Sequence, residues 1–216
     1  MDNSIKPGLP QSEPLELALW SEFQDELSKL LEIPISLYDV TGVLLAESRG
    51  EPSLCDAVKN KREGRVLCSQ AVAKVIAQVV EKGKTYIHKC HTNQYIFAIP
   101  ALLGASKSFV IVGGHVYLSG NEERDFSEGV SSLGFDPHEI QSLKSVIRTI
   151  PAKSIFTIPN IISNMALPFL KCLNQDTAPA FTQAIAPAVV APMQAAIAGE
   201  SLRNFRALEG VYRSLA

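Results

Sequence analysis

The sequence predicts an α/β domain of the α+β type, built on a five-stranded antiparallel sheet with helices on one face. Five runs are rich in β-branched and aromatic residues, at 35–40, 42–49, 85–90, 94–103 and 108–118. Thr41 and Gly42 supply turn chemistry between the first two runs, which are expected to form a hairpin. Helical segments are inserted after the second run. An antiparallel sheet therefore fits better than parallel β-α-β alternation.

Two helices are expected between the second and third strands. The first is the short segment 54–60. The second begins near Arg62, carries an apolar stripe and stops at Gly83, because glycine readily adopts the left-handed conformation that ends a helix. Another helix is expected ahead of the sheet, from the N-cap candidate Ser12 to Pro34, which would end it.

The chain becomes helical again after the fifth strand. Asn121 and Asp136 are N-cap candidates, and a proline follows Asp136 at the first helical position. The apolar segment 154–173 is expected to be a helix in which Pro159 and Pro168 favour a kink or a break, because proline lacks the amide hydrogen that a helix needs.

These elements divide the chain into three parts. Residues 1–11 are polar and carry Pro and Gly, so they are expected to form a flexible tail. Residues 12–175 form the domain, and residues 176–216 form an Ala/Pro-rich linker and a last helix, a helical C-terminal extension. Apolar residues form a stripe along one side of this last helix, at Ile197, Phe205, Leu208, Tyr212 and Leu215. Such a stripe either packs back on the domain or joins two copies of the chain.

Composition argues against several functions. The net charge is −2, so nothing favours a nucleic-acid backbone as partner. The apolar stretches are broken well before the roughly 20 residues that a membrane-spanning helix needs. The N-terminus, MDNSIKPGLPQSEP, has no basic start followed by an apolar run, as a signal peptide would. A cytoplasmic location is therefore expected.

The residues most able to carry chemistry are Cys55, Cys68 and Cys90, with His88 and His91 near the last of them. If the inserted helices cover the face of the third strand that carries Cys90, three thiols and an imidazole converge. The alternative is that the cysteines are small buried apolar residues.

Zinc is the candidate cofactor, with Cys55, Cys68, Cys90 and His91 as its ligands, since thiolate and imidazole are the ligands zinc prefers. Separations of 13 and 22 residues between successive cysteines permit a metal site without indicating one. No Cys-x-x-Cys pair is present. The typical ligand spacing of a structural zinc site is thus missing.

Catalysis is not expected. Cys90 and His91 are adjacent, but neighbouring residues of a strand point to opposite faces, so they would not meet without a bulge. No oxyanion-hole or carboxylate partner is apparent. The sequence therefore indicates a binding module and no enzyme.

Two glycines lie inside the last strand, in the run Gly113-Gly114-His115. The context of a phosphate-binding loop is absent, so the pair is expected to mark a bulge or a close approach of another backbone or a ligand. Aromatic and apolar residues alternate along the fourth strand, as do His115 and Tyr117 along the fifth if no bulge intervenes. Such residues could line a small-ligand pocket with a few polar tips.

The order of these motifs resembles the PocR-type sensory domain, a family similar to the PAS fold. The matching features are Cys55 on a short helix, Cys68 on the next, a Tyr86-x-x-x-Cys90-His91 strand and the Gly113-Gly114 strand. The resemblance extends over about residues 15 to 172. The family usually continues Cys-His with a small residue, Gly and an apolar residue, whereas this chain has Thr92-Asn93-Gln94.

The resemblance implies a PAS-like module of a bacterial signalling protein that binds a small organic molecule, a hydrocarbon derivative, between the inserted helices and the sheet. It also implies an output domain outside this segment. The apolar stripe of the C-terminal helix predicts that the signal is relayed through this helix, as a homodimer. A metal- or redox-responsive sensor built on the three cysteines is the alternative. The expected ligand contacts are Tyr86, Cys90, His91, Phe97, His115 and Tyr117.

Overall fold

Five antiparallel strands form the centre of the computed structural model, which describes residues 13–48, 54–102 and 108–173. The strands are β1 (Ile35–Asp39), β2 (Leu44–Glu47), β3 (Tyr86–Lys89), β4 (Tyr95–Leu102) and β5 (Ser108–Leu118). They lie in the order β2-β1-β5-β4-β3, and every neighbouring pair is antiparallel. The predicted five-stranded antiparallel sheet is confirmed. A sixth strand, β6 (Thr149–Ile150), pairs in parallel with the end of β5.

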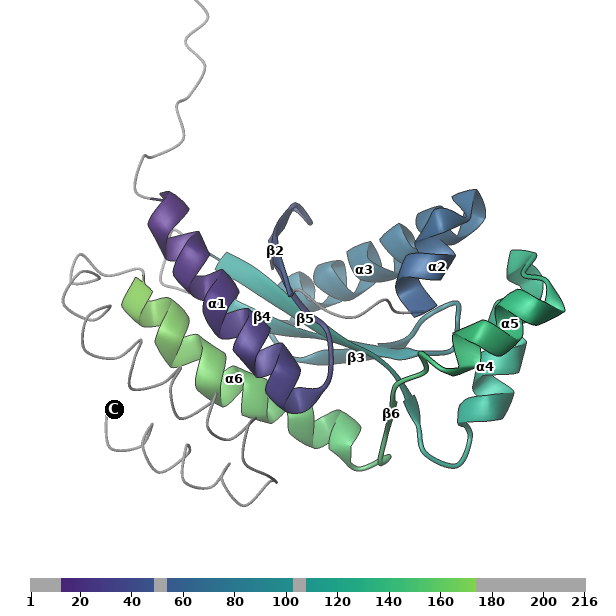
Figure 1. The fold of residues 1–216 in the computed structure, drawn as a ribbon. Coiled ribbons are helices and arrows are strands. Elements are labelled where there is room, and N and C mark those ends of the chain that lie inside the picture. Colours follow the sequence, from purple (N-terminus) through teal and green to yellow (C-terminus); the bar gives the residue numbers. More distant parts are fainter. Residues whose placement is uncertain (1–12, 49–53, 103–107, 174–216) are drawn as a thin grey trace, which may run out of the picture.

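One face of the sheet is covered by the helices inserted after β2, as the sequence predicts. These are α2 (Leu54–Asn60) and α3 (Arg62–Lys82), which lie above the sheet in Figure 1. The buried stripe of α3 is formed by Val75, Ile76 and Val79, which pack against β4 and β5. Their helical spacing brings them to one side of α3, where burial of their side chains holds the helix on the sheet.

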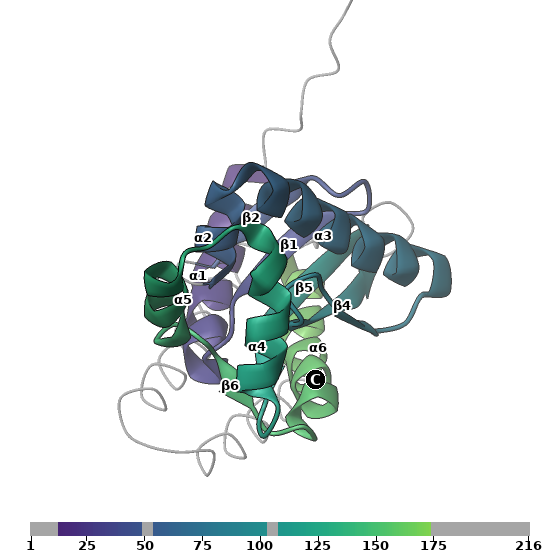
Figure 2. The ribbon, with the colours of Figure 1, turned by 90° about the vertical axis from the view of Figure 1, so that its right-hand side faces the viewer.

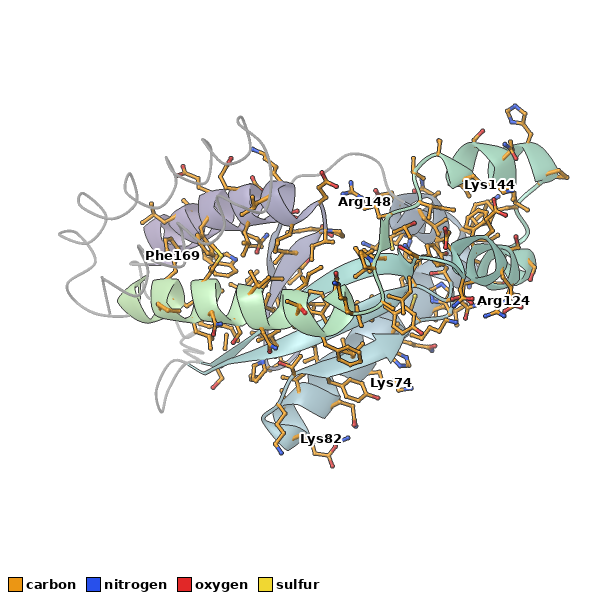
Figure 3. All side chains as sticks on the ribbon, turned by 90° about the horizontal axis from the view of Figure 1, so that it is seen from below. Lys74, Lys82, Arg124, Lys144, Arg148 and Phe169 are labelled. Atoms are coloured by element: carbon orange, nitrogen blue, oxygen red, sulfur yellow. The ribbon has the colours of Figure 1, made fainter. Side chains whose placement is uncertain are left out.

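The opposite face is covered by α1 (Glu13–Leu31) and α6 (Ser154–Leu173), which come from the two ends of the domain (Figure 1). Trp20 and Phe23 of α1 are fully buried there. Phe169 of α6 stacks on Phe23 with ring centroids 4.4 Å apart, and Figure 3 shows it on the side of α6 that faces α1. The sequence pattern predicted both helices, and the structure places them against the second face.

The helix α6 is continuous through Pro159 and Pro168, so the break that the prolines favour does not occur. Each proline removes only one backbone hydrogen bond from the helix. Ile155, Ile162 and Phe169 lie on its buried side and pack into the core on the second face of the sheet. Burial of this apolar side stabilises the helix more than the missing hydrogen bonds weaken it.

Two of the predicted helix-end residues, Gly83 and Asp136, end and begin helices as the sequence predicts. Gly83 adopts φ 62° and ends α3. Asp136 forms a complete capping box at the start of α5 (Pro137–Lys144). Asn121 does precede α4 (Glu122–Val130), but its side chain makes no capping hydrogen bond. Figure 2 views the molecule from the side on which α4 and α5 lie, beyond the end of the sheet.

Several expectations lie outside the described residues. They are the flexible tail 1–11, the cap at Ser12, and the linker and last helix within 176–216. Within the described parts of the chain, no helix combines the length and apolar character needed to cross a membrane.

Candidate ligand-binding site

A cavity of about 270 Å³ lies between the sheet and the inserted helices α2 and α3. The thiols of Cys55 from α2, Cys68 from α3 and Cys90 from the end of β3 line it together. His91, which follows Cys90, and His115 of β5 also line it. The antiparallel order of the strands brings the end of β3 next to the start of β4, which in turn lies beside the second half of β5, so residues far apart in sequence meet at one wall.

A bulge in β5 turns His115 toward this cavity. Opposite β4, Val116 pairs with Tyr95 and Gly114 pairs with Ile96, so His115 is the extra residue between the two pairs. Its φ is 57°, a left-handed conformation that a residue with a Cβ rarely adopts. The bulge shifts the alternation along β5, so that Val112 packs on the α3 side of the sheet whereas Val116, four residues later, packs on the other side.

The glycine pair before the bulge is needed because other groups approach it closely. A Cβ on Gly113 would lie 2.8 Å from the Phe97 ring. A Cβ on Gly114 would lie 2.7 Å from the Tyr95 carbonyl oxygen, and Gly114 itself has φ 106°. The expected bulge and the expected close backbone approach are both present in β5.

His115 and Cys55 are direct neighbours in the cavity wall. The Cys55 Sγ lies 3.1 Å from His115 Nδ1 and 3.4 Å from Gln94 Oε1. Gln94 is buried, and its Nε2 donates to the His115 carbonyl oxygen at 2.7 Å. The single thiol proton of Cys55 can therefore be shared between the imidazole and the Gln94 amide oxygen.

Thr92 extends this polar network to the second thiol. Its hydroxyl lies 3.1 Å from Cys90 Sγ and donates to Gln94 Oε1 at 3.2 Å. The network thus links the side chains of Cys90, Thr92, Gln94 and Cys55 along the inner wall. Buried polar groups connected in this way are held in defined orientations.

The third thiol, Cys68, faces the remaining imidazole. Its Sγ lies 4.0 Å from His91 Nε2. His91 Nδ1 is buried and has no hydrogen-bond partner among the described residues. An unpaired buried nitrogen costs free energy. A bound molecule that supplied the missing hydrogen bond would remove this cost.

Burial keeps two thiols and two imidazoles of the cavity wall uncharged at neutral pH. It raises the pKa of the Cys68 thiol to about 11 and that of Cys55 further still, and neighbouring thiols add to both shifts. Burial also lowers the pKa of His115 to about 4, with help from the Lys59 charge, and it lowers the pKa of His91. The Cys55 and Cys68 thiols and the His91 and His115 imidazoles are therefore neutral where they line the cavity.

Three of the expected ligand contacts do not line the cavity. Phe97 points to the other face of the sheet and packs with α1 and α6, because its neighbours Ile96 and Ala98 take the cavity side of β4. Tyr86 stacks with His88 near the far end of α3. Tyr117 is buried beneath α2 and α4. Cys90, His91 and His115 are the expected contacts that line it.

The residues of the site that were not predicted include Thr92, Lys59 and Arg65 of the cavity lining and Gln94 of the polar network. Lys59 lies four residues after Cys55, and Arg65 lies three residues before Cys68, so each shares a helix face with a cavity thiol. Helical spacing from the cysteines was the signal that could have identified the two cations. Thr92 and Gln94 follow Cys90-His91 directly, as polar residues in a turn between strands.

Among the described residues, no group of three or more His, Cys, Asp or Glu side chains is arranged to hold a metal ion. Cys55, Cys68, Cys90 and His91 share the cavity wall. In the contacts described above, Cys55 pairs with His115 and Cys68 pairs with His91.

The fold and the cavity define an α+β module of PAS-like architecture with a pocket between its helices and its sheet. A family model described as the sensory domain found in PocR matches residues 13–170. The chain therefore belongs to the PocR sensory domain family, which is a sensory and not a catalytic family. Comparison with curated proteins and with solved structures gave no match.

Proposed function

We propose that this domain senses a small organic molecule, a hydrocarbon derivative, by binding it without covalent chemistry in the cavity beneath α2 and α3. The observation that carries the proposal is the cavity itself, about 270 Å³ in volume, to which Val58, Val72 and Ile96 contribute apolar surface. Apolar lining with a few placed polar groups is typical of small-ligand sites. The polar groups at the inner wall are the neutral thiols and imidazoles.

Three side chains are proposed as the polar contacts. They are Cys90, His91 and His115, which line the cavity from the end of β3 and from β5. The unpaired Nδ1 of His91 supports its assignment, because a ligand hydroxyl or carbonyl could satisfy it. Tyr117 contributes indirectly, since its hydroxyl donates to the Thr92 carbonyl oxygen at 2.8 Å and holds the turn.

The turn between β3 and β4 is the proposed start of the relay. Its residue Thr92 lines the cavity, and Asn93 donates from Nδ2 to the Asp125 carbonyl oxygen of α4 at 3.1 Å. A ligand that moves the turn would therefore move α4, and through it the elements that lead to α6. The ligand acts only as far as its affinity differs between the two arrangements.

A metal- or redox-responsive sensor is the second candidate function. The observation in its favour is the presence of Cys55, Cys68 and Cys90 in one cavity wall. The raised pKa of the Cys55 and Cys68 thiols, caused first by burial, opposes it. A metal must displace the thiol protons before it binds, and this lowers its affinity.

Thermal unfolding of the full chain distinguishes the two candidates. Diols, alcohols and short acids form one panel, and zinc and other thiophilic metals form the other. A molecule that binds only the folded protein raises the melting temperature. We expect stabilisation by members of the organic panel that is lost in His91→Ala. Stabilisation by metals alone would favour the second candidate, and no stabilisation by either panel would contradict both.

The output step has its own test. We propose a homodimer formed through Phe205, Leu208, Tyr212 and Leu215, which lie outside the described residues. Sedimentation of the wild type and of the double variant Phe205→Glu, Tyr212→Glu should show a dimer and a monomer. Two monomers would contradict the dimer model.

A further inference from the structure

Two cations belong to the lining of the cavity, and each shares a helix face with one of the thiols. They are Lys59 of α2 and Arg65 of α3. The Arg65 Nε donates to the Lys59 carbonyl oxygen at 3.1 Å, which holds one edge of the guanidinium while the side chain stays exposed to solvent. The terminal nitrogens of Arg65 have no partner among the described residues. An oriented guanidinium with free N–H groups is a ready-made site for an oxyanion.

The charges that line the cavity do not balance. Glu47 is the one carboxylate among the described lining residues, against the two cations Lys59 and Arg65. Lys59 Nζ lies 3.7 Å from Glu47 Oε1, and the two side chains are 44% and 53% exposed. Such an exposed and long ion pair is weak, so Lys59 can turn to another anion at little cost. One positive charge, that of Arg65, remains without a counterion in the lining.

We propose that the ligand is a short-chain monocarboxylate, whose carboxylate binds Arg65 and Lys59 and whose apolar chain extends toward Val72 and Ile96. The inference rests on the proposed function of the cavity as a small-ligand site. A planar carboxylate matches the guanidinium fork through two parallel, charge-assisted hydrogen bonds. Its single negative charge balances the single unpaired positive charge, whereas a phosphate dianion would leave an excess.

The inner wall complements the other end of such a molecule. Val72 and Ile96 supply apolar surface within the same cavity. The Cys55 and Cys68 thiols and the His91 and His115 imidazoles are neutral, as described above, and so would repel neither an alkyl chain nor a terminal hydroxyl or carbonyl group. The size of the cavity, about 270 Å³, restricts the ligand to a small molecule.

Matched ligands test the proposal on the full chain by calorimetry and thermal unfolding. Butyrate, 1-butanol, butyramide and butyl phosphate have the same alkyl chain and differ only in the head group. We expect butyrate to bind at least about tenfold more tightly than the other three. Butyrate affinity should fall about tenfold or more in Arg65→Gln, while Arg62→Gln, an exposed residue of α3 outside the cavity lining, leaves it unchanged.

Each other outcome has a distinct meaning. Tighter binding of 1-butanol or butyramide would overturn the carboxylate and leave the proposed function intact. Tighter binding of butyl phosphate would replace the carboxylate by a phosphate head group. Binding of none of the four would overturn the carboxylate, while stabilisation by another member of the organic panel would still support the proposed function. An Arg65→Gln variant that binds butyrate like the wild type, with an unchanged melting temperature, would remove Arg65 from the site.

Discussion

His115 occupies a backbone conformation that costs free energy, and the cavity depends on it. A non-glycine residue at φ 57° in the middle of a strand is held there by its surroundings. The Gln94 amide bonds its carbonyl oxygen, and Cys55 contacts its ring. Strained residues of this kind are concentrated at functional sites, which supports His115 as a ligand contact.

The pKa of His115 predicts how stability changes with pH. Burial lowers this pKa to about 4, whereas an unfolded histidine has a pKa near 6.5. Above pH 6.5 both states are neutral and the stability is full. As the pH falls from 6.5 to 4, the unfolded state takes up the proton first, so stability is lost, by at most about 3 kcal/mol.

His115→Asn isolates this contribution, because asparagine tolerates positive φ and does not titrate. Urea unfolding at a series of pH values should give a smaller loss of stability between pH 6.5 and 4 for the variant than for the wild type. His88 and His91 are present in both proteins, so their contributions cancel. Equal pH dependence of the two proteins would contradict the lowered pKa of His115.

Gly114 is required for two separable reasons. A side chain there would be strained at φ 106° and would press on the Tyr95 carbonyl oxygen. We expect Gly114→Ala to lower the free energy of unfolding by about 2 kcal/mol or more, measured in urea. Gly134→Ala is the control, since Gly134 has φ 67° with nothing within 4 Å. A loss no larger than that of the control would show that the close contact does not matter.

At the scale of elements, the turn between β3 and β4 joins the cavity to α4. Lys89, at the end of β3, forms an ion pair of 3.0 Å with Asp125 of α4, whose side chain is only 6% exposed. Asn93 and Tyr117 add the hydrogen bonds already described. Gly129 lets the α4 backbone come against Thr92 itself. The turn is thus held on one side by α4 and faces the cavity on the other.

Gly129→Ala tests this contact. The added Cβ would lie 2.3 Å from the Thr92 carbonyl oxygen, so α4 or the turn must move. We expect a loss of about 2 kcal/mol or more in urea unfolding and faster alkylation of the half-buried thiol Cys68. Ser127→Ala, at an exposed position of the same helix, should change neither quantity. Unchanged alkylation in a destabilised Gly129→Ala protein would argue against coupling between α4 and the cavity.

At the scale of the whole molecule, α1 and α6 close the second face of the sheet. Trp20, Phe23 and Phe169 form an aromatic cluster between them, with centroid distances of 4.4 to 6.4 Å. The two helices are separated by the entire sheet in sequence. Their packing therefore joins the two ends of the domain in one apolar core.

Phe169→Ala should weaken this unit strongly. Truncation of a buried phenylalanine costs about 3–5 kcal/mol, from lost burial and from the cavity that remains. The single tryptophan, Trp20, contacts Phe169 and reports the transition by fluorescence during urea unfolding. Phe156→Ala on the same helix is the control, because Phe156 is 67% exposed and should cost little. Similar losses of unfolding free energy for the two variants would contradict a strong contribution of the aromatic cluster to stability.

Local patterns along the chain were sufficient to predict the strands, the inserted helices, the cap at Gly83 and the capping box at Asp136. These features depend on residues within one turn or one strand, so the printed sequence contains their cause. The order of strands and helices also sufficed for the antiparallel sheet. Residue chemistry led to the cysteines and to the histidines beside Cys90, and the family resemblance matched the same positions.

The composition of the cavity wall was decided only by the tertiary structure. A one-residue bulge at His115 changes which side chains of β5 share a face, and no sequence period reveals it. Phe97 was assigned to the ligand and packs on the other face, because alternation alone does not say which side of a strand the helices cover. The contact between Cys55 and His115 joins residues 60 positions apart. Such contacts arise from the packing of whole elements, and local spacing does not contain that information.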